Sequence, residues 1–238
     1  MTFNKLAGIS LVLAVVVGLV AALLTPGGLL TETVDASDFI QATEVLGDNA
    51  ALGQYATFIF VISVVLYWFG LSTLQRAFAG GSVMDRVSRF ALNIFLVGYA
   101  FLIVELSIRH VLIHVLEHGV GGSAAEEKAI ATALFAAAGG LHFAFLYVTA
   151  IGSAIFGWGL AQRCAGMSIF KLASLGLSLT GLLSFIVLII AEHISQIDLH
   201  GVIVFSNIVL LFGSLCILVI GVGIMQDREE FVGEEAAA

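Results

Sequence analysis

Six long apolar runs dominate this sequence and decide what it can fold into. They lie at about residues 6–25, 55–75, 88–115, 129–161, 170–194 and 201–225. A helix of roughly 20 apolar residues crosses the hydrocarbon core of a bilayer, which is about 30 Å thick. Because 60% of the 238 residues are hydrophobic and only 11% are charged, little chain remains for a soluble domain. The sequence therefore predicts an all-α integral membrane protein in which residues 1–238 form a single bundle of six transmembrane helices.

The positions of lysine and arginine predict which side of the membrane each loop occupies. Basic residues near the ends of spans are retained preferentially in the cytoplasm. With a cytoplasmic N-terminus, only Arg109 and Lys128 fall outside, and the basic residues that fall inside are Lys5, Arg76, Arg86, Arg89, Arg163, Lys171 and Arg228. We therefore expect both termini in the cytoplasm of a prokaryote, an outer loop over residues 26–54 and an acidic cytoplasmic tail over residues 226–238.

The charge balance restricts the partners of the protein. The formal net charge of −8 comes largely from the first outer loop and the tail. Nucleic-acid binding needs a face of clustered Lys and Arg, so nucleic acid is excluded as a partner. The expected partners are the lipid bilayer and, beyond it, either other membrane subunits or further copies of this chain.

Two local patterns predict how the helices are covered and packed. The stretch DASDFIQATEVLG, residues 35–47, begins with capping residues and predicts a short amphipathic helix near the outer surface. Close helix packing inside lipid depends on small residues. Such residues form faces on the fourth and fifth runs, namely Ser153 and Gly157 on one and Ser174, Ser178 and Gly181 on the other.

An internal repeat relates the second and third runs to the fourth and fifth. Residues 69–83, FGLSTLQRAFAGGSV, align with residues 156–169, FGWGLAQRCAGMSI, after one deletion. The alignment continues until Glu105 matches Glu192, and a fainter third copy surrounds Gln226. This predicts three tandem helical hairpins that form a parallel repeat about an axis along the membrane normal. The alternative is a resemblance of composition alone.

The stretch RHVLIHVLEHG, residues 109–119, places three histidines at intervals of four. On a helix, His110, His114 and Glu117 lie within about 60° of one another, with His118 some 40° beyond. Neutral imidazoles four residues apart can ligate one metal ion. The alternative is that these histidines are solvated at the membrane interface and bind nothing.

The end of the fifth run strengthens the metal hypothesis. It carries Glu192 and His193, followed by His200, at the same predicted membrane level as the first histidine group. Imidazole nitrogen suits copper, zinc, iron or the iron of a b-type haem, and carboxylates commonly orient such ligands. The predicted ligands are His110, His114 and His193, oriented by Glu117 and Glu192.

Two further ionisable positions lie deeper in the predicted spans. Glu105 precedes Arg109 by four residues, which predicts an intrahelical ion pair. His142 lies about half way along the fourth run beside Gly139 and Gly140, which leave room for another helix or a flat cofactor. His142 is expected either to bind a haem iron or to form a hydrogen bond; the candidate partners are Tyr99, Ser107 and Asn207. Ionisable groups at such depth point to function.

Three functional hypotheses follow, and the sequence leaves open whether the protein is an enzyme. It has no Gly-rich phosphate loop, no G-x-S-x-G motif and no H-E-x-x-H motif. The first hypothesis is electron transfer or metal handling by the outer His and Glu cluster. The second is a non-catalytic packing subunit of a larger membrane complex, and the third is a carrier of a small solute or ion that uses Glu105.

Overall fold

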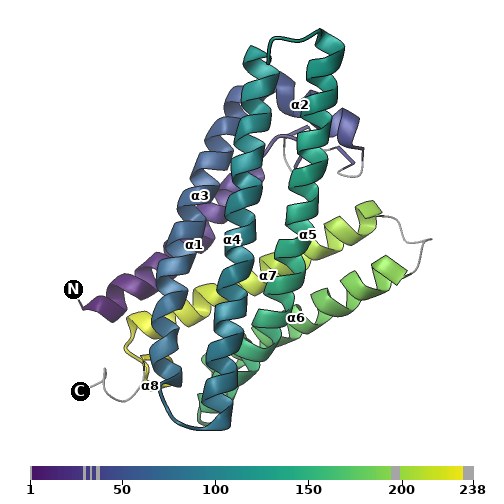
Figure 1. Ribbon diagram of the computed structural model, residues 1–238. Helices are drawn as coiled ribbons and strands as arrows, with labels where there is room; N and C mark the ends of the chain where they lie inside the picture. Colours follow the sequence, from purple (N-terminus) through teal and green to yellow (C-terminus); the bar gives the residue numbers. More distant parts are fainter. Residues whose placement is uncertain (1, 29–30, 33, 36–37, 194–198, 233–238) are drawn as a thin grey trace.

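The computed structural model describes residues 2–28, 31–32, 34–35, 38–193 and 199–232, with the backbone alone for Glu192, Leu199 and His200. Within these residues, six helices are long and apolar enough to cross a membrane (Figure 1). They are α1 (Phe3–Leu24), α3 (Ala50–Thr73), α4 (Val83–His118), α5 (Ala124–Arg163), α6 (Ile169–His193) and α7 (Leu199–Met225). The shorter elements are α2 (Phe39–Asp48), the 3-10 helix η1 (Leu74–Phe78) and α8 (Glu229–Val232). The prediction of an all-helical membrane protein with six spans is confirmed.

The six long helices form a closed ring. Each packs mainly on its two neighbours, in the order α1, α3, α4, α5, α6, α7 and back to α1. Asn4 at the start of α1 donates a hydrogen bond to Asp227 after α7, at 3.0 Å, so the start of α1 and the end of α7 lie at one end of the bundle. We call this end the terminal face and the opposite end, which holds α2 and the turn between α4 and α5, the loop face (Figure 1).

The long central helices begin earlier than the apolar runs indicate. Helix α4 begins at Val83, where the Ser82 hydroxyl caps it by accepting a hydrogen bond from the Asp85 backbone at 3.0 Å. Helix α5 begins at Ala124, behind a capping box formed by Ser123 and Glu126. With 36 and 40 residues, these helices are longer than a bilayer requires. In Figure 1 both extend beyond the other helices at the loop face.

The first connection contains the predicted short helix. Helix α2 is capped by Asp38, whose carboxylate accepts a hydrogen bond from the Gln41 backbone at 3.0 Å. The side chain of Leu46 is buried against the loop-face ends of α4 and α5. The connection ends at residue 49, because α3 begins at Ala50, so the loop expected over residues 26–54 is shorter than predicted.

Small residues bring α5 and α6 into close contact, as predicted. A methyl group at Gly157 would lie 2.6 Å from the Ser178 backbone nitrogen and 2.7 Å from the Ser174 carbonyl oxygen. The Ser178 hydroxyl donates to the Ala154 carbonyl at 2.6 Å. These contacts fit the general rule that small side chains and hydroxyl hydrogen bonds join helices in lipid.

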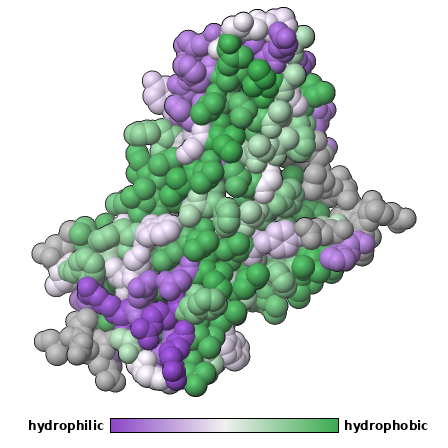
Figure 2. Space-filling view, viewed as in Figure 1, coloured by the Kyte–Doolittle hydropathy of each residue, from purple (hydrophilic) through white to green (hydrophobic). Residues whose placement is uncertain are grey.

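The outer surface of the ring is apolar. Large hydrophobic side chains are exposed along the helices, among them Val97 and Val104 on α4 and Leu179 and Ile186 on α6. Figure 2 shows hydrophobic residues over the middle of the molecule and hydrophilic residues gathered towards its two ends. This distribution matches contact with a lipid bilayer.

The matching glycines of the predicted repeat have partly matching contacts. Gly157 on α5 packs on α6, and Gly221 on α7 packs on α1, which in each case is the next helix around the ring. Gly70 on α3 instead packs on α1, the preceding helix. The tandem repeat and the cytoplasmic position of the termini stay predictions.

Candidate functional site

An ionisable pair lies between α4 and α5, inside the apolar part of the bundle. His142 Nδ1 is 3.1 Å from Glu105 Oε2. The Glu105 side chain is 12% exposed and that of His142 is 28% exposed. The two residues are 37 positions apart in the sequence, so the packing of α4 on α5 creates the pair. Ionisable groups within spans usually face protein or a water-filled cavity and mark proton or ion pathways.

Arg109 lies one helical turn from Glu105 toward the loop face. Its Nε atom is buried and has no hydrogen-bond partner among the described residues. The expected intrahelical ion pair is not formed within 4 Å in the described part of the chain, because Glu105 is paired with His142 instead. The positive charge of Arg109 still acts on both members of the pair. A cation, a carboxylate and an imidazole therefore share one site.

Open space borders α5 one turn before His142. A methyl group added at either Gly139 or Gly140 would meet no atom within 4 Å among the described residues. The predicted room beside these glycines is therefore present. The expected hydrogen-bond partners of His142, which were Tyr99, Ser107 and Asn207, are replaced by Glu105.

Aromatic rings continue from His142 toward the terminal face. The His142 ring packs on Phe145 with centroids 5.7 Å apart, and Phe145 packs on Tyr99 at 5.9 Å. Further on, Phe156 packs on Phe95 and on Phe78, with centroids 6.2 and 5.9 Å apart. Phe78 and Phe156 are fully buried. This second group, Phe78, Phe95 and Phe156, is an apolar cluster between α4, α5 and η1, and we call it the aromatic layer.

A polar pocket of about 530 Å³ opens at the terminal face, beyond the aromatic layer. Arg163 and Asp85 line it and form an ion pair at 3.3 Å. Phe78 also lines it, so the pocket reaches one member of the aromatic layer. Sequence reasoning missed this pocket, although Gln162 and Arg163 belong to the Q-R motif of the predicted repeat.

Cysteine chemistry is not favoured near this pocket. The Cys164 side chain is buried between α5 and α6, and burial is the main cause that raises the pKa of its thiol. A thiol with a raised pKa is a poor nucleophile at neutral pH. Cys164 and Cys216 are both free.

The histidines of the predicted metal site lie at the loop-face half of α4. His110, His114 and His118 are all exposed, and the rings of His114 and His118 stack with centroids 4.5 Å apart. Glu117 Oε2 accepts a hydrogen bond from Gln54 at 2.6 Å and lies 3.9 Å from His118 Nδ1. This end of α4 is therefore polar and open to its surroundings.

The second half of the predicted metal site is described only in part. His193 Nδ1 lies 2.8 Å from the Ile189 carbonyl oxygen of its own helix. The side chains of Glu192 and His200 lie outside the described residues. Across the residues that were described, no group of three or more His, Cys, Asp or Glu side chains could hold a metal ion. The metal or haem site stays a prediction, which metal analysis and an absorption spectrum of the purified protein would test.

A comparison of the chain with models of protein families, with curated proteins and with solved structures finds no match.

Proposed function

We propose that this protein conducts protons across the membrane through Glu105 and His142. The observation that carries the proposal is the 3.1 Å contact between the carboxylate and the imidazole within the membrane-spanning part of the bundle. Imidazole gains and loses a proton near neutral pH, and carboxylate and histidine chains form the proton relays of many membrane pumps and transporters. This proposal develops the carrier hypothesis, in which Glu105 handles a small ion.

Arg109 supplies the electrostatic setting of the proposed relay. It lies one helical turn from Glu105 on α4, and its buried Nε atom has no hydrogen-bond partner among the described residues. The positive charge of Arg109 repels further positive charge at this site, which favours passing an arriving proton on over keeping it.

The aromatic layer supplies the barrier that a regulated pathway needs. Phe78, Phe95 and Phe156 lie between the pair and the terminal-face pocket. An apolar layer without water stops proton movement until it opens, as in hydrophobic gates of channels. With the predicted cytoplasmic termini, the pocket would face the cytoplasm and the pair would face the outer half of the membrane.

The test is proton flux into vesicles that contain the purified protein. A pH-sensitive dye inside the vesicles reports flux, and potassium with valinomycin sets the membrane potential. We expect flux above that of protein-free vesicles, and we expect Glu105→Gln to lower it to the protein-free level, because an amide does not take up a proton in this range. The matched control is Glu117→Gln, which changes a carboxylate at the loop-face end of the same helix, hydrogen bonded to Gln54, and should leave flux unchanged.

Two results would contradict the proposal. One is a parent protein whose flux equals that of protein-free vesicles at every potential applied. The other is a Glu105→Gln variant that conducts as well as the parent. Either result would leave the packing-subunit hypothesis in front.

A further inference from the structure

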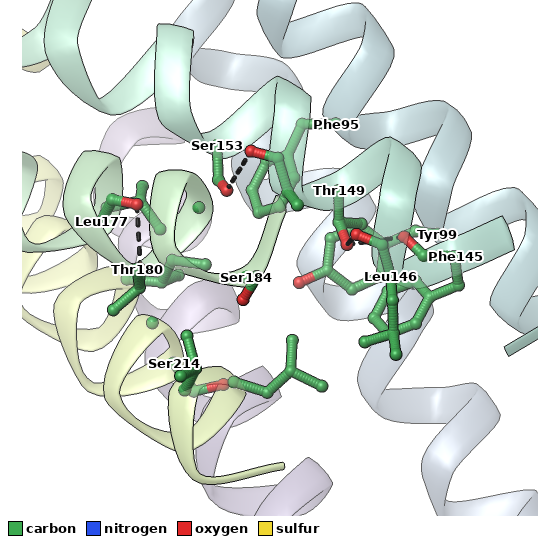
Figure 3. A pocket seen from close by; sticks show the side chains of 16 residues that line it. Phe95, Tyr99, Phe145, Leu146, Thr149, Ser153, Leu177, Thr180, Ser184 and Ser214 are labelled. Atoms are coloured by element: carbon green, nitrogen blue, oxygen red, sulfur yellow. Dashed lines mark hydrogen bonds between the residues drawn. The ribbon is translucent and has the colours of Figure 1, made fainter. Parts of the chain in front are cut away.

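A small cavity, partly open on one side, lies between α4, α5, α6 and α7. Its volume is about 50 Å³. Figure 3 shows side chains from all four helices pointing into this space. Part of the lining is apolar, and the rest consists of hydroxyl groups. The hydroxyl-bearing residues are Tyr99, Thr149, Ser153, Thr180, Ser184 and Ser214.

The hydrogen bonds of these hydroxyls determine what the cavity can accept. Thr149, Ser153 and Thr180 each donate their hydrogen to a carbonyl of their own helix, at 2.6, 3.2 and 2.9 Å. Since a hydroxyl has one hydrogen and two lone pairs, these three oxygens have only acceptor capacity left. The matching occupant is a hydrogen-bond donor.

The size of the cavity restricts the occupant further. A pocket for an organic solute usually has a volume of roughly 300–1,000 Å³. One water molecule needs a cavity volume of about 10–15 Å³ and two to four polar partners. A cavity of about 50 Å³ therefore suits a few water molecules. A bare metal cation is disfavoured because the cavity lining contains no carboxylate and an uncompensated charge in a low-dielectric interior is costly.

The cavity adjoins the Glu105 and His142 pair. Tyr99 and Phe145 line it, and the same Phe145 ring packs on His142. On the other side, Phe95 belongs both to the lining and to the aromatic layer. The cavity thus lies between the ionisable pair and the barrier.

We propose that the cavity holds a cluster of water molecules that continues the proton path from Glu105 and His142 to the aromatic layer. The inference rests on the proposed function and adds how the proton moves. The proton passes along water molecules, and the path has no room for a larger solute. Water hydrogen bonded to acceptor-only hydroxyls keeps its own lone pairs available for an incoming proton.

Gly213 offers a variant that fills the cavity without distorting the helices. A methyl group there would lie 3.5 Å from Thr180 Oγ1 and 4.0 Å from Leu177 Cδ1, which are ordinary contact distances. We expect Gly213→Val to displace water and to lower proton flux to the level of protein-free vesicles. The matched control is Gly47→Val, which adds the same side chain to α2, where the new carbon would lie at an ordinary contact distance of 3.7 Å from Leu116 Cδ1, and it should conduct as the parent does.

The outcomes separate the two proposals. If Gly213→Val conducts like the parent while Glu105→Gln does not, the water cluster is overturned and the proton relay survives. If both variants conduct like the parent, both proposals fail. Should Gly213→Val not yield a monodisperse helical protein, Gly213→Ala is the milder replacement and should lower flux in part.

A second measurement does not depend on flux. An experimental structure at a resolution that shows water should contain ordered water within hydrogen-bond distance of Thr180 and Ser184. A dry cavity in that structure would overturn the inference even if Gly213→Val lowered flux.

Discussion

The α1–α3 and α4–α5 interfaces join helices in different ways. Between α1 and α3, Ser10 donates to the Leu66 carbonyl at 3.0 Å and Ser63 donates to the Ala14 carbonyl at 2.7 Å. Gly70 leaves room for α1 to approach closely. Neutral hydroxyls and small residues therefore hold this pair of helices together.

The α4–α5 interface has the same kind of packing and adds an ionisable pair to it. Gly98 on α4 lies against Thr149, and Gly152 on α5 lies against the Phe95 backbone. Glu105 and His142 lie beyond these contacts toward the loop face. Because hydroxyls and small residues suffice to join α1 to α3, the α4–α5 interface does not need ionisable groups for adhesion. The comparison supports a functional role for Glu105 and His142.

The largest expected effect comes from removing one member of the ionisable pair. His142→Ala leaves the Glu105 carboxylate without its partner, and breaking a buried pair costs about 3 kcal/mol when the site is partly open to its surroundings. The free energy of unfolding is measured by titration with sodium dodecyl sulfate in mixed micelles. The control is the double variant Glu105→Leu and His142→Leu, which should be close to the parent in stability. A His142→Ala protein as stable as the parent would show that the pair is not energetically coupled.

The second prediction is the effect of replacing glycines of α5 on the free energy of unfolding. Gly157→Ala places a methyl group against the α6 backbone and should destabilise the protein by about 2 kcal/mol, as expected for overpacking. Gly139→Ala adds the same methyl group in open space, where alanine is favoured over glycine within a helix by roughly 0.5–1 kcal/mol. The same detergent titration measures both. Equal stabilities for the two variants would mean that α5 and α6 do not pack as described.

The sequence predicts the helices better than it predicts their ends. Apolar runs identify all six spans because burial in lipid demands a continuous apolar stretch. The first turns of α4 and α5 carry charged residues, so a hydropathy criterion places both starts too late. The capping pattern Ser123 to Glu126 was nevertheless readable. It would have placed the start of α5 correctly.

The members of the candidate site could be predicted, but their pairing could not. Glu105 and His142 are each conspicuous as ionisable residues within apolar runs. Helical periodicity relates residues on one helix, and it therefore favoured Arg109 as the partner of Glu105. The rotation of α4 against α5 is fixed by contacts such as Gly98 with Thr149. The sequence pattern of a single helix gives no information about that rotation.

A smaller effect is expected from the hydroxyls of the α1–α3 interface. Ser63→Ala removes the hydrogen bond to the Ala14 carbonyl, and hydrogen bonds between helices in lipid average about 0.6 kcal/mol. Ser72→Ala is the control, because the Ser72 hydroxyl donates to the Trp68 carbonyl of its own helix and has no hydrogen bond to a neighbouring helix among the described residues. We expect the control to match the parent in the same titration. If Ser63→Ala lowered the free energy of unfolding more than His142→Ala does, the α1–α3 hydrogen bond would contribute more to stability than the Glu105 and His142 pair.

The smallest effect is expected at an ion pair that is shorter than that of Glu105 and His142 but lies outside the apolar region. Lys128 Nζ on α5 is 2.6 Å from Glu44 Oε1 on α2, and the two side chains are 51% and 55% exposed. A pair in which both side chains are more than half exposed is expected near the lower end of the usual range, at about 0.2 kcal/mol, since solvent screens it. Helix α2 is also held by Leu46, which is almost fully buried, so Glu44→Gln should leave it docked.

The salt concentration should affect the exposed Lys128 and Glu44 pair more than the buried Glu105 and His142 pair. High salt should remove most of the stability difference between Glu44→Gln and the parent, because ions screen exposed charges over about 3 Å at 1 M. The difference between His142→Ala and the parent should persist, because the Glu105 side chain is only 12% exposed. Detergent titrations at low and high salt measure both differences. If salt abolished the effect of His142→Ala as well, Glu105 would be open to water, and the depth of burial that supports its proposed role would be lost.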